Sequence, residues 1–192
     1  MSADLLHGTE PPSDWVKRWS HLVQAQGTVL DVACGHGRHA RWFYRLNHTL
    51  TLVDRSQAAM DAIAMAAPAC NKVVADIENG PWPLTDRQFD AVVVTNYLWR
   101  PLMPTLLASL APGGVLIYET FAVGNETVGK PSRADFLLQP GELLQVCKHL
   151  RVVAFEDGFV QSTGNTSPRF VQRIVAIRED AVNTPPARYP LT

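Results

Sequence analysis

The sequence predicts an α/β fold in which helices cover both faces of a mostly parallel sheet. Strand-like and helix-like segments alternate as far as Glu119, and this rhythm implies parallel strands joined by right-handed crossovers. A turn of small residues follows the first strand, and the continuous apolar run FDAVVVT suits a strand that is buried on both faces. Open sheets of this kind bind their ligands outside the carboxyl ends of the strands.

The turn lies within VLDVACGHGRHA, residues 29–40, and the rest of the chain is arranged around it. The preceding strand has Asp31 at its carboxyl end, and the turn itself, from Ala33 to Gly37, carries little side-chain bulk. A helix is expected from Arg38 to Leu46. Because a tight turn and a helix N-terminus bring backbone N–H groups against a ligand, this segment predicts a cofactor site.

The elements on either side of the turn have signals of their own. An apolar stripe at helical spacing follows Ser13, which predicts a capped helix packed on the sheet, and Trp15 is a candidate wall of a lid over the cofactor. The next strand, 49–53, ends in Asp54, and Ser56 caps the helix after it. A short third strand, 72–75, also ends in an acid, Asp76.

The second half of the chain continues the pattern and then departs from it. After a loop at 77–87, strands are expected at 89–95 and 115–119, with a helix that starts at Pro101 between them. Loops as long as the polar stretch 121–139 are usually functional or disordered in compact domains, and this one is expected to cover the acceptor. A helix from Pro140 and an antiparallel hairpin of residues 151–160 and 170–177 follow. We expect a single domain over 1–192, with residues 1–12 and 179–192 as loose arms.

Composition limits the class of partner. The chain has 192 residues, a formal net charge of −1 and a hydrophobic content of 46%, which is typical of a globular protein. A chain without excess positive charge is not expected to bind nucleic acid, and no apolar run is long enough to cross a membrane. Three cysteines without metal-ligand spacing, and a start that lacks a signal-like pattern, predict a cytoplasmic protein that holds no metal.

Two cofactors fit the small-residue turn. Residues 35–40, GHGRHA, satisfy the dinucleotide fingerprint, with Asp54 about 20 residues further on. A pyrophosphate would meet the like charge of Asp31, however, and a dinucleotide needs no second acid such as Asp76. S-adenosylmethionine has no phosphate, and Asp31, Asp54 and Asp76 can accept its ammonium, ribose diol and adenine amino group, with the backbone of Ile77 at the ring edge. These residues favour S-adenosylmethionine over a nicotinamide dinucleotide.

At this point the sequence resembles the class I S-adenosylmethionine-dependent methyltransferases, over residues 29–177. The resemblance lies in VLDVACGHG, the acid of TLVDRS, VVADIE, FDAVVVTNYL and LAPGGVLIYE, which follow the family's order. It implies a Rossmann-like sheet of seven strands with an antiparallel last strand. Ala33 replaces the first glycine of the family's turn, whereas Gly35 and Gly37 are present. GHGRH is also similar to the small tellurite-resistance-type branch.

The resemblance implies cofactor contacts from the turn and from the strand ends beside it. The residues expected to bind S-adenosylmethionine are Asp31, Ala33, Cys34, Gly35, Gly37, Arg38, Asp54, Arg55, Asp76, Ile77 and Asn96. The candidate catalytic residues are Tyr97, which would line the methyl group, and Glu119, which would be a base or an anchor for the loop after it. A buried, hydrogen-bonded Tyr97 is the alternative. Arg100 is either a ligand of an anionic acceptor or a surface arginine, and His39 is expected to be solvated.

Methyl transfer mainly requires that acceptor, methyl group and sulfur be held in line. Such orientation can supply up to ~7–11 kcal/mol, and a base is needed only if the acceptor arrives protonated. The compact size, the near-neutral charge and the lack of an appended recognition domain favour a small-molecule acceptor. A protein or RNA acceptor, and a non-catalytic protein that binds the cofactor, are the alternatives.

Overall fold

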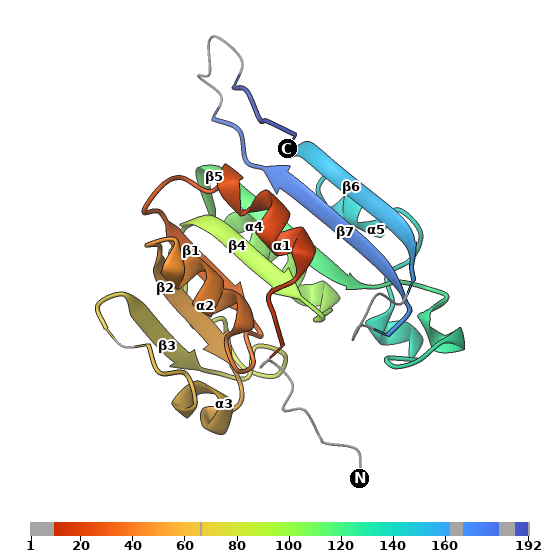
Figure 1. Ribbon diagram of the computed structural model, residues 1–192, viewed down its shortest axis with the longest axis horizontal. Coiled ribbons are helices and arrows are strands. Elements are labelled where there is room, and N and C mark those ends of the chain that lie inside the picture. The colour runs from red at the N-terminus through yellow and green to blue at the C-terminus, as the bar shows by residue number, and fades with distance from the viewer. Residues whose placement is uncertain (1–9, 66, 162–166, 181–186, 192) are drawn as a thin grey trace.

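The computed structural model describes residues 10–65, 67–161, 167–180 and 187–191, and a twisted sheet runs through the middle of them (Figure 1). The strands are β1 (Thr28–Val32), β2 (Thr49–Asp54), β3 (Cys70–Val74), β4 (Phe89–Thr95), β5 (Leu110–Phe121), β6 (Arg151–Val160) and β7 (Arg169–Ile177). Their order is β3-β2-β1-β4-β5-β7-β6. The pairs from β3 to β5 are parallel, and β7 is antiparallel to both β5 and β6. The predicted fold class is confirmed.

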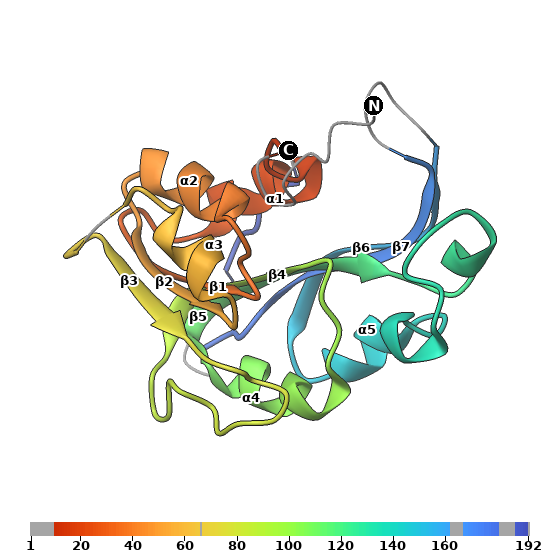
Figure 2. The same ribbon diagram turned by 90° about the horizontal axis from the view of Figure 1, so that it is seen from below.

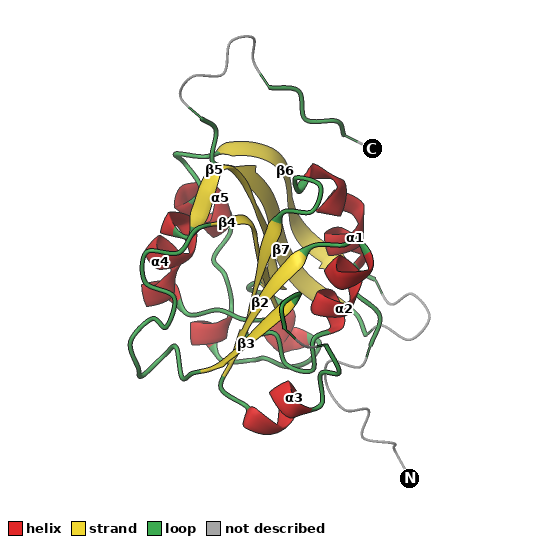
Figure 3. Ribbon diagram, turned by 90° about the vertical axis from the view of Figure 1, so that its left-hand side faces the viewer, coloured by secondary structure: helices red, strands yellow, loops and turns green. Residues whose placement is uncertain are grey.

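Helices lie on both faces of the sheet (Figures 2 and 3). The α-helices are α1 (Asp14–Trp19), α2 (Arg38–Arg45), α3 (Gln57–Asp61), α4 (Met103–Ala108) and α5 (Glu142–Val146). Short 3-10 turns are η1 (Ser20–Leu22), η2 (Arg100–Leu102), η3 (Asn125–Thr127) and η4 (Ala134–Phe136). The helices α1, α2 and α3 cover one face, and α4 and α5 cover the other.

Each face of the sheet has its own hydrophobic core. The core under α1, α2 and α3 takes Val29 from β1, Val93 from β4, Ile117 from β5 and Val175 from β7. The opposite core takes their immediate neighbours in the strands, because successive side chains of a strand point to opposite faces. Asp31, Thr95, Glu119 and Arg173 each lie two residues from one of these apolar positions and therefore share the face of α1 and α2. The same face that is apolar in the middle becomes polar at the carboxyl edge of the parallel strands.

Several predicted boundaries shift. The third strand begins at Cys70 rather than at Lys72, because Leu50 of β2 already pairs with Cys70. The fifth strand begins at Leu110 rather than at Val115, since Leu110 pairs with Phe89 ahead of an irregularity in the ladder. The long stretch 121–139 holds the two turns η3 and η4, and Ala122 forms an isolated parallel bridge with Leu138 that closes it into a loop.

The expected loose arms fall largely on residues 1–9 and 181–186, which lie outside the described residues. Among the described residues, no helix combines the length and the apolar character that a membrane span needs.

Candidate functional site

The loop between β1 and α2 turns with three residues in the left-handed region. Ala33 has φ +52°, Gly35 has φ +52° and Gly37 has φ +72°. A Cβ atom on Gly35 would meet no heavy atom within 4 Å, so the backbone here faces open space, whereas one on Gly37 would lie 2.9 Å from Ile63. Gly37 therefore allows α2 to start close to the neighbouring segment, and Gly35 leaves the loop surface bare.

Asp54, at the end of β2, holds this loop in place. Its Oδ2 accepts a 2.8 Å hydrogen bond from the Gly35 N–H, and its Oδ1 accepts one of 2.9 Å from the Ser56 N–H. The Cys34 N–H donates to the Val53 carbonyl next to it. A carboxylate oxygen has two lone-pair directions, so each oxygen of Asp54 keeps one acceptor position for a ligand.

Asp76 follows β3 and organises the turn after it. Its Oδ1 accepts hydrogen bonds from the backbone N–H groups of Glu78 and Asn79, and its Oδ2 accepts one from the Asn79 side chain. These bonds, that of the Asn79 side chain above all, lower the pKa of Asp76. The carboxylate therefore stays ionised, and Oδ2 retains an acceptor position.

A cavity of about 220 Å³ opens between the two acids. It is lined by Ala33, Asp54, Arg55, Ala75, Asp76, Ile77, Glu78 and Tyr97. Six of the predicted site residues thus share one pocket at the ends of β1 to β4. A larger hollow of about 620 Å³ lies between α2 and residues 62–65 and 67–69, and none of the predicted site residues lines it.

Asp31 is buried on the α1 and α2 side of the loop, and its Oδ2 has no hydrogen-bond partner among the described residues. Burial raises the pKa of this carboxyl from 3.8 to about 7. The charge of Arg38 and a hydrogen bond from the Ala40 backbone N–H act in the opposite direction and lower the pKa. Burial also lowers the pKa of Arg38, although the acids Glu10, Glu119 and Asp31 act in the opposite direction. The side chains of Asp31 and Arg38 are therefore close enough to influence each other beside the loop.

Cys34 differs from the other loop residues in where its side chain lies. Its Sγ contacts the Met60 sulfur at 4.0 Å and is buried, and this burial raises the pKa of the thiol. A contact of Cys34 with a ligand would therefore come from its backbone. Asn96, with φ +54°, is exposed at the end of β4, and its N–H donates to the Glu119 carbonyl.

Tyr97 has a half-buried ring at the wall of the cavity. Its hydroxyl is buried without a hydrogen-bond partner in the part of the chain that the structure describes. Burial, followed by the charge of the nearby Glu78, raises the pKa of this hydroxyl. Tyr118, by contrast, is a buried tyrosine whose hydroxyl donates to the Tyr97 carbonyl at 2.8 Å.

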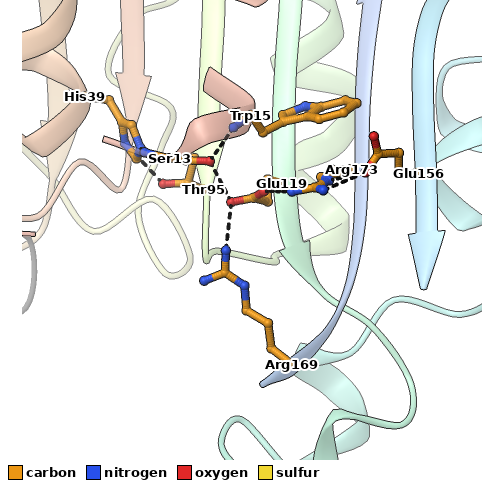
Figure 4. Close-up of polar contacts among 8 residues, drawn as sticks. All are labelled: Ser13, Trp15, His39, Thr95, Glu119, Glu156, Arg169 and Arg173. Atoms are coloured by element: carbon orange, nitrogen blue, oxygen red, sulfur yellow. Dashed lines mark hydrogen bonds and ion pairs between the residues drawn. The ribbon is translucent and has the colours of Figure 1, made fainter. Parts of the chain in front are cut away.

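Glu119 is the centre of a buried polar network at the same edge (Figure 4). Its Oε1 accepts a 2.9 Å hydrogen bond from the Ser13 hydroxyl, and its Oε2 accepts one of 3.0 Å from Arg173. Arg173 also pairs with Glu156 and stacks 4.9 Å from the centre of the Trp15 ring. Trp15 is buried, and each oxygen of Glu119 accepts a hydrogen bond within this network.

His39 is buried in this network rather than solvated, so that expectation was wrong. Its Nε2 accepts a 3.2 Å hydrogen bond from the Ser13 N–H, and its Nδ1 contacts the Thr95 hydroxyl at 3.3 Å. Since Nε2 is an acceptor, Nδ1 carries the proton and donates to Thr95. Burial, with the charges of Arg38 and Arg41, lowers the pKa of His39 to about 3, so the ring is neutral.

The guanidinium of Arg100 is fully engaged within the protein, so it is not available to bind an anionic acceptor, and it is not a surface arginine without contacts. Its guanidinium donates to both oxygens of Glu142 at 2.7 and 2.9 Å, and to the carbonyls of Asp135 and Leu137. It therefore clamps the end of the 121–139 loop onto the start of α5.

Sequence reasoning missed Ser13, Arg169 and Arg173 as residues of this edge. The sequence identifies Ser13 as a helix N-cap. It gives no sign that Ser13 contacts Glu119, which lies 106 positions further along the chain. Arg173 faces Glu119 only because the antiparallel register of β5 and β7 pairs the two residues. The early part of β7 thus reaches the same edge as the late parts of the parallel strands.

The loop, the strand-end acids and the seven-stranded order define a Rossmann-like α/β protein with a cavity at the carboxyl edge of its sheet. Residues 29–114 match a family model described as a methyltransferase domain. This segment of the chain is therefore similar to a methyltransferase domain, and the fold agrees with the resemblance to class I S-adenosylmethionine-dependent methyltransferases. No curated protein is similar enough in sequence to match.

Solved structures share the fold at low sequence identity. TehB from Haemophilus influenzae aligns with a TM-score of 0.69 and 18% identity over 89% of this chain, which spans 63% of the TehB chain. An S-adenosylmethionine-dependent methyltransferase from Methanosarcina mazei aligns with a TM-score of 0.66 and 12% identity over 88% of this chain and 99% of its own. The glycopeptide N-methyltransferase MtfA, in complex with S-adenosylhomocysteine, aligns with a TM-score of 0.59 and 16% identity over 85% and 87% of the two chains. MtfA also has a structure with sinefungin.

Proposed function

We propose that this protein binds S-adenosylmethionine and transfers its methyl group to a small-molecule acceptor. The observation that carries the proposal is the cavity between Asp54 and Asp76, which opens directly beside a loop of bare backbone. The complexes of MtfA with S-adenosylhomocysteine and sinefungin support the choice of cofactor, because that protein has the same fold. A formal net charge of −1 supports a small acceptor over a polyanionic one.

The residues present fit the chemical groups of this cofactor. Asp54 would accept the ribose hydroxyls with the lone pairs that Gly35 and Ser56 leave free, and Asp76 would accept the adenine amino group. The orphaned Oδ2 of Asp31 would accept the ammonium, and Arg38 beside it would pair with the carboxylate. A zwitterionic amino-acid group thus meets one acid and one base on the methionine side of the loop.

When bound, S-adenosylmethionine supplies a methyl group on a sulfonium, whose sulfur becomes a neutral thioether after transfer. The residues of the chain would orient the cofactor and the acceptor and would exclude water from the site. Tyr97 would form a wall beside the methyl group, with its hydroxyl protonated because the pKa is raised. Cys34, Gly37 and Arg55 would line the cofactor from the loop and from the end of β2, and Asn96 would lie between cofactor and acceptor.

Calorimetric titration tests the cofactor half of the proposal. The protein should bind S-adenosylmethionine and S-adenosylhomocysteine and should not bind NAD. Asp54→Ala should weaken binding by at least about tenfold, or about 1.4 kcal/mol, and still fold. Asp61→Ala removes an exposed carboxylate on α3 and is the matched control, with affinity unchanged. Binding of NAD in place of S-adenosylmethionine, or an unaltered affinity in Asp54→Ala, would refute the assignment.

Transfer of a labelled methyl group to a panel of metabolites tests the acceptor half. Label in a small product supports a small-molecule methyltransferase. Label that enters only added protein or RNA would overturn the choice of acceptor. Tight cofactor binding without any transfer would instead indicate a non-catalytic protein of the same fold.

A further inference from the structure

Two arginines at the carboxyl edge of the sheet differ in the contacts that their side chains make. Arg173 donates hydrogen bonds to both Glu119 and Glu156 and stacks on Trp15. Arg169 lies four residues earlier on the same face of β7 and approaches Glu119 only at 3.8 Å. Its guanidinium donates no hydrogen bond to a described residue, and its Nε is buried without an acceptor.

Within the part of the chain that the structure describes, the buried Nε donor of Arg169 therefore lacks a hydrogen-bond acceptor. A guanidinium carries five N–H donors, and a buried donor without an acceptor costs free energy, so a native protein usually satisfies it. Glu119 forms an ion pair with Arg169, but at 3.8 Å the two groups are too far apart for a hydrogen bond. The Nε donor of Arg169 therefore lacks an acceptor among the described residues, and an acceptor from outside the chain would satisfy it.

The charges around Arg169 favour an anion once the cofactor is bound. The acids that act on this corner are Glu10, Asp31, Glu119 and Glu156, and the bases are Arg38, Arg169 and Arg173. Burial raises the pKa of Asp31 to about 7, so this carboxyl carries only part of a negative charge at neutral pH. S-adenosylmethionine brings one net positive charge, its sulfonium, which attracts an anionic acceptor to the methyl group.

The neighbouring side chains that could remove a proton from an acceptor are already engaged. Glu119 is held in its ion pair, and both ring nitrogens of His39 make hydrogen bonds while its pKa is lowered to about 3. An acceptor whose attacking atom carries no proton at neutral pH suits this corner. A carboxylate meets this condition, and its planar pair of oxygens matches a guanidinium.

We propose that the methyl acceptor is a small organic acid, that Arg169 binds its carboxylate, and that this carboxylate is methylated on oxygen. The inference rests on the proposed function. One oxygen would be held by Arg169, and the other would form a bond to the methyl carbon. The carbon–sulfur bond breaks with its electron pair on sulfur, and no proton moves. The product is a neutral methyl ester, which a guanidinium holds less tightly than the acid, so the arginine also favours product release.

The test uses the full chain with methyl-labelled S-adenosylmethionine. The acceptors are straight-chain monocarboxylic acids of two to eight carbons, succinate and benzoate, each paired with its amide. A methyl ester releases labelled methanol in mild alkali, whereas N-methyl and S-methyl products do not. We expect alkali-volatile label from the acids and none from the amides. Label that is stable to alkali, or no label from any acid, would overturn the inference.

Substitution of Arg169 separates this inference from the proposed function. Arg169→Lys should raise the KM for the acid by about tenfold and Arg169→Met by more, because the planar donor pair is lost. The affinity for S-adenosylmethionine should stay within about twofold in both variants. Arg45→Met, on the exposed end of α2, is the matched control and should change neither value. An unchanged KM in Arg169→Met would contradict the role of Arg169. Failure of the unmodified protein to bind S-adenosylmethionine would instead contradict the proposed function.

Discussion

The hydroxyl of Ser13 donates a 2.9 Å hydrogen bond to Oε1 of Glu119, across 106 positions of the sequence. The same hydroxyl accepts from the Trp15 N–H and caps α1, while the Ser13 N–H donates to His39. One serine therefore joins the start of α1, the helix after the glycine loop and the end of β5. This junction fixes the first turn of α1 against the edge where the acceptor would bind.

Ser13→Ala should destabilise the protein by about 1–2 kcal/mol, because it removes both a helix cap and a hydrogen bond to a buried carboxylate. Urea unfolding measures the change. Ser56→Ala is the matched control, since Ser56 caps α3 through the Ala59 N–H and its hydroxyl makes no bond to an acid. The larger loss should occur at Ser13, and equal losses at the two serines would show that the bond to Glu119 adds nothing.

Glu119→Gln separates a general base from an anchor. If Glu119 anchors α1 and β7, the variant should lose about 1–3 kcal/mol of stability and keep its kcat within a few-fold, measured below its melting temperature. If Glu119 is a base, kcat should fall by 10²-fold or more at unchanged stability. Glu156→Gln removes the more exposed partner of the same arginine and should cost less than about 1 kcal/mol.

Arg100→Lys should release the end of the 121–139 loop. Lysine cannot pair with both oxygens of Glu142 while it also donates to two carbonyls in the plane of a guanidinium. Hydrogen exchange should speed up about tenfold at the amides of residues 134–142, as expected for a loss of about 1.4 kcal/mol of local stability. Arg133→Lys, in an exposed pair with Asp135, should leave the exchange unchanged. Equal protection in both variants would contradict the clamp.

Much of this fold follows from local patterns in the sequence. The run from Phe89 to Thr95 forms β4 at the predicted boundaries, because a strand covered on both faces must be apolar throughout. Asp54 and Asp76 follow neighbouring strands of a parallel sheet, so their meeting at one cavity follows from topology alone. These predictions needed no knowledge of contacts between distant side chains.

The rest of the site depends on such contacts. His39 is a polar residue on a short helix, and its burial requires a donor from Ser13 and an acceptor from Thr95, neither of which a helical pattern can identify. Arg169 reaches the edge because β7 runs antiparallel to β5, so its position depends on the register of two distant strands. The left-handed φ of Ala33 is likewise set by the loop as a whole, since alanine alone does not favour it.

The buried carboxyl of Asp31 should make cofactor binding depend on pH. Its pKa is raised from 3.8 to about 7, so the folded protein holds this proton more tightly than the unfolded chain does. The contribution of Asp31 to stability is therefore full below about pH 4 and is lost as the pH rises to about 7. An ammonium beside Asp31 favours the ionised form, so S-adenosylmethionine should displace the proton and bind more tightly as the pH rises from 6 to 8.

Calorimetry in two buffers of different ionisation enthalpy counts the protons released on binding. Close to one proton should be released at pH 6 and almost none at pH 8.5, because Asp31 is already ionised there. Asp31→Asn should abolish the release and weaken binding, and should also remove the loss of stability between pH 4 and pH 7. The Asp61→Ala control should release protons as the unmodified protein does. Proton release that persists in Asp31→Asn would assign the titrating group elsewhere and contradict the role of Asp31.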